Sequence, residues 1–256
     1  MNFDDTPQEA AFRAEARAWI QANAPKELEA ELSQPTVGRI KLKNRDILEE
    51  SKKWQKKKAE AGWACLHWPR EFGGRGASPI ERVIWQQEEG FYGKLEGVFL
   101  IGQGMCGPTV MAYGSDADKA KYLPKIASGE NVWCQLFSEP SAGSDVAGLR
   151  TRAERKGDDW IINGQKVWTT GAHFSDYGIL ITRTDPTQPK HKGLTMFWLD
   201  MKSPGVTVKP IKQANGQSEF NEVYFADVKI PDSQRLGKVG DGWNVSLTTL
   251  MNERMS

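Results

Sequence analysis

The residues of this chain with the clearest capacity for chemistry lie in two short segments, 136–148 and 168–170. The first follows an apolar run and combines glycines with small hydroxyl residues, which leave its backbone N–H groups uncovered. Such a loop suits a pyrophosphate or the polar edge of a flat heterocycle. In the second, an indole that can stack lies next to hydroxyls that can donate hydrogen bonds. An ordinary strand-to-loop turn and a core tryptophan explain the same residues, so each segment alone leaves both interpretations open.

Other motifs of binding and catalytic proteins are weak in this sequence. Residues 102–107 read GQGMCG and satisfy the glycine pattern of dinucleotide-binding loops, but no strand–helix–strand pattern continues from them. Close helix packing explains these glycines better. The sequence has neither a P-loop pattern nor a GxSxG nucleophile elbow. Its three histidines lie far apart, which argues against a metal site.

Composition narrows the class of protein. The 256 residues include 34 basic and 33 acidic side chains, a net charge of +1 that argues against a nucleic-acid partner. With 39% hydrophobic and 26% charged residues the chain is globular. No apolar run approaches the roughly 18 residues of a membrane span, so no membrane partner is expected. Three scattered cysteines and a start without signal-peptide character predict a cytoplasmic location.

The first half of the sequence has helical periodicity. Apolar spacing predicts helices at residues 7–23, 44–61, 79–92, 98–112 and 117–127. Thr6 and Pro7 are typical of a helix start. Pro124 predicts a bend or an early end of the last of these helices.

From about residue 131 the pattern changes to short strands. Strands are predicted at residues 132–137, 177–182, 194–199, 206–211 and 223–230. Residues 156–159 and the Asn163-Gly164 pair predict hairpin turns. Because no helix-length segment separates the strands, we expect an antiparallel or mixed sheet. A last helical pattern begins at Trp243 and places Leu247, Leu250 and Met251 on the face of that tryptophan.

Together, the two segments resemble those of the acyl-CoA dehydrogenase family of flavoproteins. SEPSAGSD at residues 138–145 resembles the family signature, and residues 156–170 resemble the hairpin that follows it. WPREFGG at residues 68–74, and residues 121–130 and 228–237, resemble further family stretches in the same order. The resemblance implies an α+β fold with three parts: an α-helical N-terminal domain at 1–130, a middle β-barrel or sandwich domain at 131–238, and the start of a C-terminal helical bundle at 239–256.

The resemblance also implies FAD as the cofactor. Ser138 would hydrogen-bond the pyrimidine end of the isoalloxazine, and Ser144 would face phosphate or the thioester substrate. Trp168 would pack against the flavin, and Thr170 would donate its hydroxyl near flavin N5. The full set of implied cofactor residues is Gln135, Leu136, Phe137, Ser138, Gly143, Ser144, Trp168, Thr169 and Thr170.

The reaction implied is α,β-dehydrogenation of an acyl-CoA thioester, in which a carboxylate takes the α proton and the β hydride goes to flavin N5. Asn252-Glu253-Arg254 resembles the Glu-Arg pair that supplies this base in some branches of the family. Glu253 is therefore the candidate base, and Glu253 and Arg254 are candidate substrate contacts. A surface or interface ion pair is the alternative. Glu139 is expected to be structural and to hold the loop.

Partners follow from the same resemblance. An electron-transfer flavoprotein would accept the electrons, and the chain would form a homo-oligomer, a dimer or a tetramer, or a heteromer. Against the family the sequence is short, so we expect a truncated chain or a subunit, with an exposed apolar helix face and weak FAD affinity. Two other functions stay open: a non-catalytic or half-site subunit that needs a partner chain, and a flavin oxidase or monooxygenase of the same fold.

Overall fold

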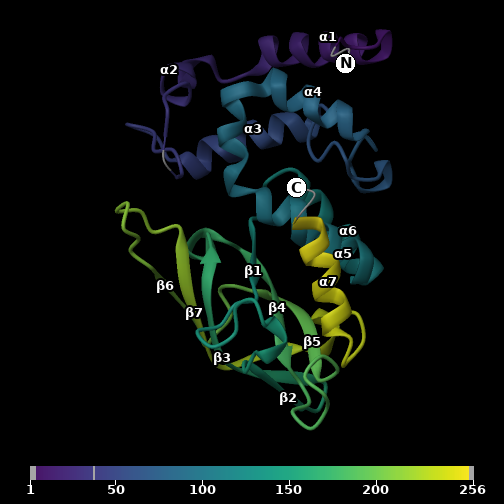
Figure 1. The fold of residues 1–256 in the computed structure, drawn as a ribbon, viewed down its shortest axis with the longest axis vertical. Helices are drawn as coiled ribbons and strands as arrows, with labels where there is room; N and C mark the ends of the chain where they lie inside the picture. The colour runs from purple at the N-terminus through teal and green to yellow at the C-terminus, as the bar shows by residue number, and fades with distance from the viewer. Residues whose placement is uncertain (1–3, 37, 254–256) are drawn as a thin grey trace. The chain divides into compact units, whose positions relative to one another are not determined.

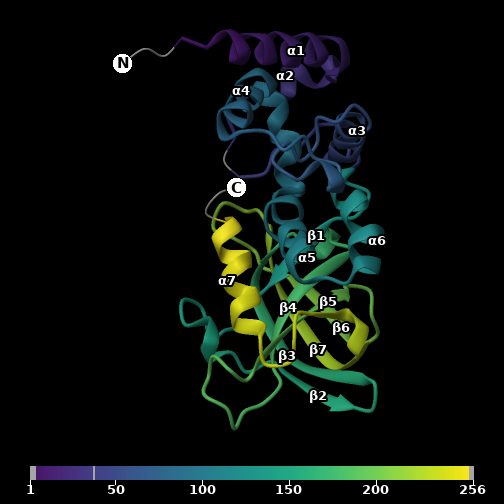
Figure 2. The ribbon, with the colours of Figure 1, turned by 90° about the vertical axis from the view of Figure 1, so that its right-hand side faces the viewer.

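The computed structural model describes residues 4–36 and 38–253, which pack as two compact units (Figures 1 and 2). The helical unit holds the described residues up to Val98 and Ala127–Glu130. The sheet unit holds Phe99–Ile126 and the described residues from Asn131 on. This combination confirms the predicted α+β class, while the domain divisions at residues 130 and 238 stay predictions. Among the described residues, no helix combines the length and apolar character that a membrane crossing requires.

Among its described residues, the helical unit contains four α-helices. α1 begins as predicted, because the Thr6 hydroxyl accepts a hydrogen bond from Glu9 N at 3.3 Å and the Glu9 carboxylate accepts one from Thr6 N at 2.7 Å. The helix predicted at 79–92 ends three residues early, since Gly90 turns to a φ of +53° and 3₁₀ turns follow. The α-helices are α1 (Pro7–Asn23), α2 (Glu29–Leu32), α3 (Ile47–Glu60) and α4 (Pro79–Glu89), with 3₁₀ turns at Lys26–Leu28, Arg70–Phe72 and Gly90–Val98.

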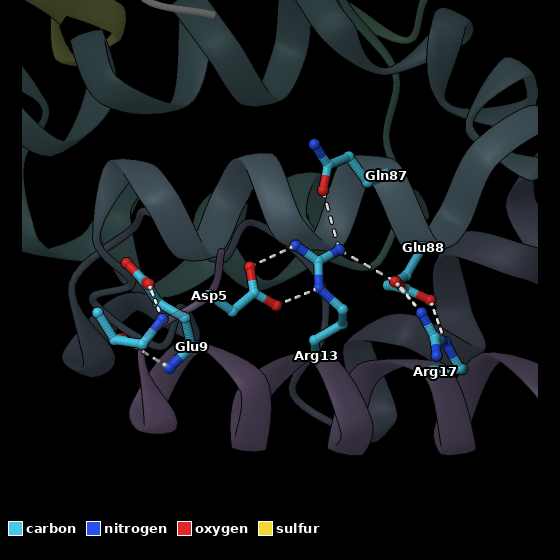
Figure 3. A network of polar contacts seen from close by, with 7 residues as sticks. Asp5, Glu9, Arg13, Arg17, Gln87 and Glu88 are labelled. Carbon is cyan, nitrogen blue, oxygen red and sulfur yellow. Dashed lines mark hydrogen bonds and ion pairs between the residues drawn. The ribbon is translucent and has the colours of Figure 1, made fainter. Parts of the chain in front are cut away.

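An arginine network joins α1 to α4 (Figure 3). The Arg13 guanidinium donates to both carboxylate oxygens of Asp5, at 2.5 and 2.9 Å, and to Gln87 and Glu88 at 2.9 and 3.1 Å. Arg17 donates twice to Glu88, at 2.8 and 2.9 Å. These side chains are partly exposed, so the ion pairs align the two helices but contribute little stability.

A buried charge cluster lies in the core of the helical unit. The Lys58 ammonium is fully buried, lies 3.0 Å from Glu89 Oε1 and also pairs with Glu96. The indoles of Trp54 and Trp85 donate to the two oxygens of Glu89 at 2.7 and 2.9 Å. Burial and the charge of Glu96 raise the pKa of Glu89 to about 7. Burial opposes the charge of Lys58, but the attraction of both carboxylates outweighs it and raises the lysine pKa.

The sheet unit is organised by one eight-stranded mixed sheet. Its order is β6-β7-β3-β2-β4-β5-β8, and β1 pairs with β4. The β1–β4 and β2–β4 pairs are parallel and the others antiparallel. The sheet is therefore mixed, one of the two arrangements expected because no helix-length segment separates the strands. The strands are β1 (Trp133–Leu136), β2 (Arg152–Lys156), β3 (Asp159–Thr170), β4 (Tyr177–Arg183), β5 (Leu194–Asp200), β6 (Val206–Pro210), β7 (Phe220–Pro231) and β8 (Arg235–Leu236).

Three α-helices, α5 (Gly107–Tyr113), α6 (Asp116–Ala127) and α7 (Gly242–Glu253), accompany the sheet. α7 runs beside α5 and β5 (Figures 1 and 2). Gly102 and Gly104 of the 102–107 pattern lie in a π-helical turn, Gly102–Cys106, and Gly107 begins α5. A Cβ on Gly102 would be in ordinary contact with that of Trp133, at 3.5 Å, so this helical turn packs against β1. α6 continues through Pro124 to Ala127, so the predicted early stop is wrong, because the buried side chains of that turn hold the helix together.

One predicted turn is wrong. β2 and β3 are joined at residues 156–159 as expected, but the Asn163-Gly164 pair lies inside β3, at a bulge against β7. A Cβ on Gly164 would lie 2.5 Å from Thr151 Oγ1, so glycine is needed where the chain before β2 crosses close to β3. The Asn163 side chain exchanges hydrogen bonds with Asp227 at 2.9 and 3.0 Å. Cross-strand pairing has overridden the local turn preference.

Candidate functional site

The two chemically suggestive segments lie side by side in the sheet unit. Val167 N donates to Ser138 O at 2.9 Å, and Lys166 Nζ donates to Phe137 O at 2.9 Å. The loop that follows β1 is thus hydrogen-bonded to the last residues of β3. The fold therefore places the two segments next to each other.

Glu139 holds this loop closed. Its carboxylate lies 2.9 Å from Lys166 Nζ and accepts hydrogen bonds from Arg150 N at 2.6 Å and Thr151 N at 2.9 Å. Burial opposes the charge of Glu139, but Lys166 and the backbone N–H of Arg150 outweigh it and hold the pKa of Glu139 below its usual value. Burial lowers the pKa of Lys166 to about 8. These contacts agree with the expected structural role of Glu139.

Trp168 is an exposed aromatic held in a strained backbone. Its φ is +59°, which is unfavourable for a bulky L-residue, and it lies where β3 carries two residues opposite one of β7. Of the ten tryptophans, it alone is exposed, with 58% of its surface accessible. Its ring meets that of Phe220 edge-on, with centroids 6.1 Å apart. Its exposure shows that Trp168 is not a core tryptophan, and strain together with exposure makes it a candidate functional position.

The residues around Trp168 supply hydroxyl groups. Thr170 and Ser138 are half-buried, whereas Thr169 is buried and its hydroxyl has no hydrogen-bond partner within the described parts of the chain. A buried hydroxyl without a hydrogen-bond partner costs free energy, so the Thr169 hydroxyl needs a partner that the described chain does not supply. The chain therefore presents an aromatic plate flanked by polar groups.

The remaining predicted cofactor residues divide by burial. Gln135 is half-buried, and Gly143 and Ser144 are exposed in the loop beyond Glu139. The side chains of Leu136 and Phe137 are buried, so these two residues offer a ligand only main-chain atoms.

Glu253 lies on a different element, the last described turn of α7, and is exposed. The predicted contact Arg254 lies outside the described residues. α7 packs through its small residues, with Thr249 Oγ1 2.8 Å from Thr109 Oγ1, and leaves Leu247 and Met251 exposed. The exposed apolar helix face expected from the sequence is thus confirmed.

A basic depression of about 690 Å³ adjoins the loop. Arg183 crosses beneath it and donates to the carbonyls of Ala147, Leu149 and Lys190. The cationic side chains on its wall are Arg150, Arg152, Arg183 and Lys190. Glu154, which pairs with Arg152 at 3.0 Å, is the acidic residue among its lining residues.

Sequence reasoning gave no role to two residues of this site, Lys166 and Phe220. Lys166 had no clear signal, because its neighbours Gly164 and Gln165 give no alternating apolar pattern that would mark it as buried. Phe220 had none, since its place opposite the end of β3 follows from the β3–β7 register.

The comparisons with known proteins agree with this fold. Residues 6–130 match the model of the acyl-CoA dehydrogenase N-terminal domain, and residues 134–228 match that of the acyl-CoA dehydrogenase middle domain. A helical unit followed by a sheet unit fits the order of these two domains. The chain belongs to the acyl-CoA dehydrogenase family.

Individual relatives support the assignment. The acyl-CoA dehydrogenase IpdE1 of Mycobacterium tuberculosis is 40% identical over 243 residues, which are 95% of this chain and 62% of that protein. The crystal structure of the ChsE4-ChsE5 complex from Mycobacterium tuberculosis matches with a TM-score of 0.79 and 32% identity, over 98% of this chain and 61% of that one. A glutaryl-CoA dehydrogenase from Mycobacterium smegmatis in complex with FADH2 matches with a TM-score of 0.71 and 25% identity, over 98% and 60%. The chain spans about 62% of the length of IpdE1.

Proposed function

We propose that this chain binds FAD and belongs to an enzyme that oxidises acyl-CoA thioesters between the α and β carbons. One observation carries the proposal: an exposed tryptophan with a φ of +59° lies one residue beyond the hydrogen bond that ties β3 to the Ser138 loop. A planar cofactor that stacks on Trp168 would cover apolar surface that the described chain leaves in water. The family is FAD-dependent, and an FADH2 complex is among the similar structures.

The residues present fit such a cofactor. Ser138 and Thr170 supply half-buried hydroxyl donors on the two segments that meet at Val167, and Thr169 supplies a buried hydroxyl without a partner in the described chain. Glycine and serine in the loop beyond Glu139 leave room for main-chain N–H groups to approach phosphate oxygens. FAD, when bound, would accept the hydride that leaves the β carbon of the substrate.

The chain's own residues would orient the reactants and exclude water. Trp168 would hold the cofactor ring by stacking, and Thr170 would donate its hydroxyl to the ring edge. The Ser138 hydroxyl would bond the opposite, pyrimidine end, and Ser144 would face a phosphate or the thioester. Hydrogen bonds to groups that gain negative charge are worth roughly 1.5–3 kcal/mol each, which favours reduction of the ring.

Glu253 is the proposed base for the α proton, with Arg254 beside it in the sequence. The basic depression bordered by Arg150 and Arg183 supports a substrate with anionic phosphates, as coenzyme A has. We expect an electron-transfer flavoprotein as the acceptor of the electrons, and a cytoplasmic location.

The decisive experiment is FAD titration of the purified chain, followed by addition of an acyl-CoA panel without oxygen. We expect a bound-flavin spectrum, at least tenfold weaker FAD binding in Trp168→Ala, and bleaching by one class of acyl-CoA. Trp243→Ala, a half-buried tryptophan on α7, is the matched control. Failure of Trp168→Ala to weaken FAD binding would contradict the proposed site. If Glu253→Gln keeps both flavin and turnover, the base lies elsewhere.

A second candidate is a subunit that functions only with a partner chain. The exposed Leu247 and Met251 on α7 favour it, and the ChsE4-ChsE5 structure is a complex of two proteins. Light scattering of the purified chain, with FAD present, tests this candidate. A partner-dependent subunit would gain its yellow colour only when a second polypeptide is added.

A further inference from the structure

The region between β1 and β3 contains a buried ion pair that the proposed chemistry does not use. Lys166 is completely buried, and 6% of the Glu139 surface is exposed. Their charged atoms are 2.9 Å apart. At this depth neither side chain can touch a cofactor that lies on Trp168, so any effect on the cofactor must act through other residues.

On one side, the pair closes the loop on itself. The Glu139 carboxylate accepts from the backbone N–H groups of Arg150 and Thr151, eleven and twelve residues further along the chain. Glu139 and Ala142 also exchange backbone hydrogen bonds of 2.9 and 3.1 Å. The segment that carries Gly143 and Ser144 is therefore fixed at both ends by one carboxylate.

On the other side, the pair fixes the bulge of β3. Lys166 Nζ donates to Phe137 O, and the next residue, Val167, donates its backbone N–H to Ser138 O instead of to β7. The register against β7 shifts between Lys166 and Thr169, and Trp168 takes its left-handed conformation inside that interval. The position of Trp168 relative to Ser138 is thus set through Lys166.

Buried ion pairs are a poor source of stability, since apolar residues of similar volume often replace them at no cost. Their better attested use is to fix a register. We propose that Glu139 and Lys166 are positioning residues for the cofactor: the pair locks the Ser138 loop onto the Trp168 bulge, so that the stacking plate and the hydroxyl donors form one surface. This inference rests on the proposed FAD site.

The test separates positioning from support of the fold. The double variant Glu139→Met/Lys166→Met removes both charges, so no lone charge stays buried, but the N–H groups of Arg150 and Thr151 lose their acceptor. FAD affinity is therefore compared per folded molecule. If the pair positions the cofactor, its FAD dissociation constant rises at least tenfold, and the amides of Arg150, Thr151 and Val167 exchange with solvent at least tenfold faster. If the FAD dissociation constant and the amide exchange rates of the double variant both stay within twofold of their wild-type values, the proposal is wrong.

Two further variants keep the result interpretable. Glu139→Gln has nearly the same shape as wild type and is used if the double variant does not fold. We expect it to lose at least threefold in FAD affinity. An unchanged FAD affinity would overturn the proposal. Lys58→Met removes the other fully buried lysine, in the helical unit, and is expected to leave FAD affinity per folded molecule unchanged. An equal loss of FAD affinity in Lys58→Met would also overturn it.

The inference and the proposed function fail differently. If the wild-type chain binds no FAD, the proposed site is wrong, and amide exchange without FAD then decides the inference alone. Faster exchange at Val167, whose N–H bonds to Ser138 O and to neither side chain of the pair, would still show that the pair sets the register. Unchanged exchange at Val167 would refute it.

Discussion

Each unit of the molecule buries one lysine completely against glutamate, but the carboxylates have different surroundings. In the helical unit, Lys58 is shared by Glu89 and Glu96, and indole N–H groups complete the shell of Glu89. In the sheet unit, Lys166 has the single carboxylate of Glu139, whose other partners are backbone N–H groups.

Because of this difference, the pKa values of the two glutamates shift in opposite directions. One cation shared by two carboxylates leaves a surplus negative charge, and with burial it raises the pKa of Glu89 to about 7. At Glu139 the single lysine and the aligned backbone donors overcome burial and lower the carboxyl pKa. The same residue types therefore serve two purposes. The Lys58 cluster joins side chains of helices in a core, whereas the Lys166 pair holds main-chain atoms of a loop in register.

The largest effect is expected when Lys58 is removed. Lys58→Met leaves two carboxylates facing each other without a cation, which should lower the free energy of unfolding by about 3–5 kcal/mol. Urea denaturation followed by circular dichroism measures this loss. The double variant Lys58→Met/Glu89→Leu should recover only part of this loss, because no fully buried charge is then unpaired but the indole N–H groups of Trp54 and Trp85 lose their acceptor. A single variant as stable as wild type would contradict the importance of this cluster for the core.

A smaller effect is expected from pH, with opposite signs in the two units. Because folding raises the pKa of Glu89 from 4.5 to about 7, its contribution is present below pH 4.5 and is lost as pH rises to about 7. The loss is about 3 kcal/mol at most, since a pKa change of one corresponds to roughly 1.4 kcal/mol. Folding lowers the pKa of Glu139, so its contribution is present above pH 4.5 and is lost on acidification.

Differences between wild type and single variants isolate these two contributions. The stability of wild type relative to Glu89→Gln should fall as pH rises from 4.5 to 7. Relative to Glu139→Gln it should fall as pH drops below 4.5. Urea unfolding at a series of pH values gives both curves, and two curves of the same sign would remove the distinction between the clusters.

The smallest effect is expected in the sheet unit, where β3 at Gly164 passes close to Thr151. Gly164→Ala puts a Cβ 2.5 Å from Thr151 Oγ1, next to the residue that binds Glu139, and should cost about 1–3 kcal/mol. Gly157→Ala is the matched control, because Gly157 also has a positive φ but open space around it. Thermal unfolding compares them, and equal losses would mean that backbone conformation, not the contact with Thr151, decides the cost.

Much of the fold could be predicted because its signals are local. The Thr6–Glu9 cap, the helix that ends before Gly62 and the turn at residues 156–159 each depend on neighbours within four positions. The Asn163-Gly164 pair failed for the opposite reason. Its strong turn preference was overruled by Thr151 and by pairing with Asp227, both distant in sequence.

The site divides in the same way. The sequence by itself determined the two segments, the family and the residue types that suit a flat, anionic cofactor, because these are written in runs of adjacent residues. The tertiary structure alone decided that Ser138 lies against Val167, that Lys166 pairs with Glu139, and that Trp168 is exposed at a bulge. These contacts join residues about 30 positions apart, and they depend on the strand register and the packing of the whole sheet, which no local pattern encodes.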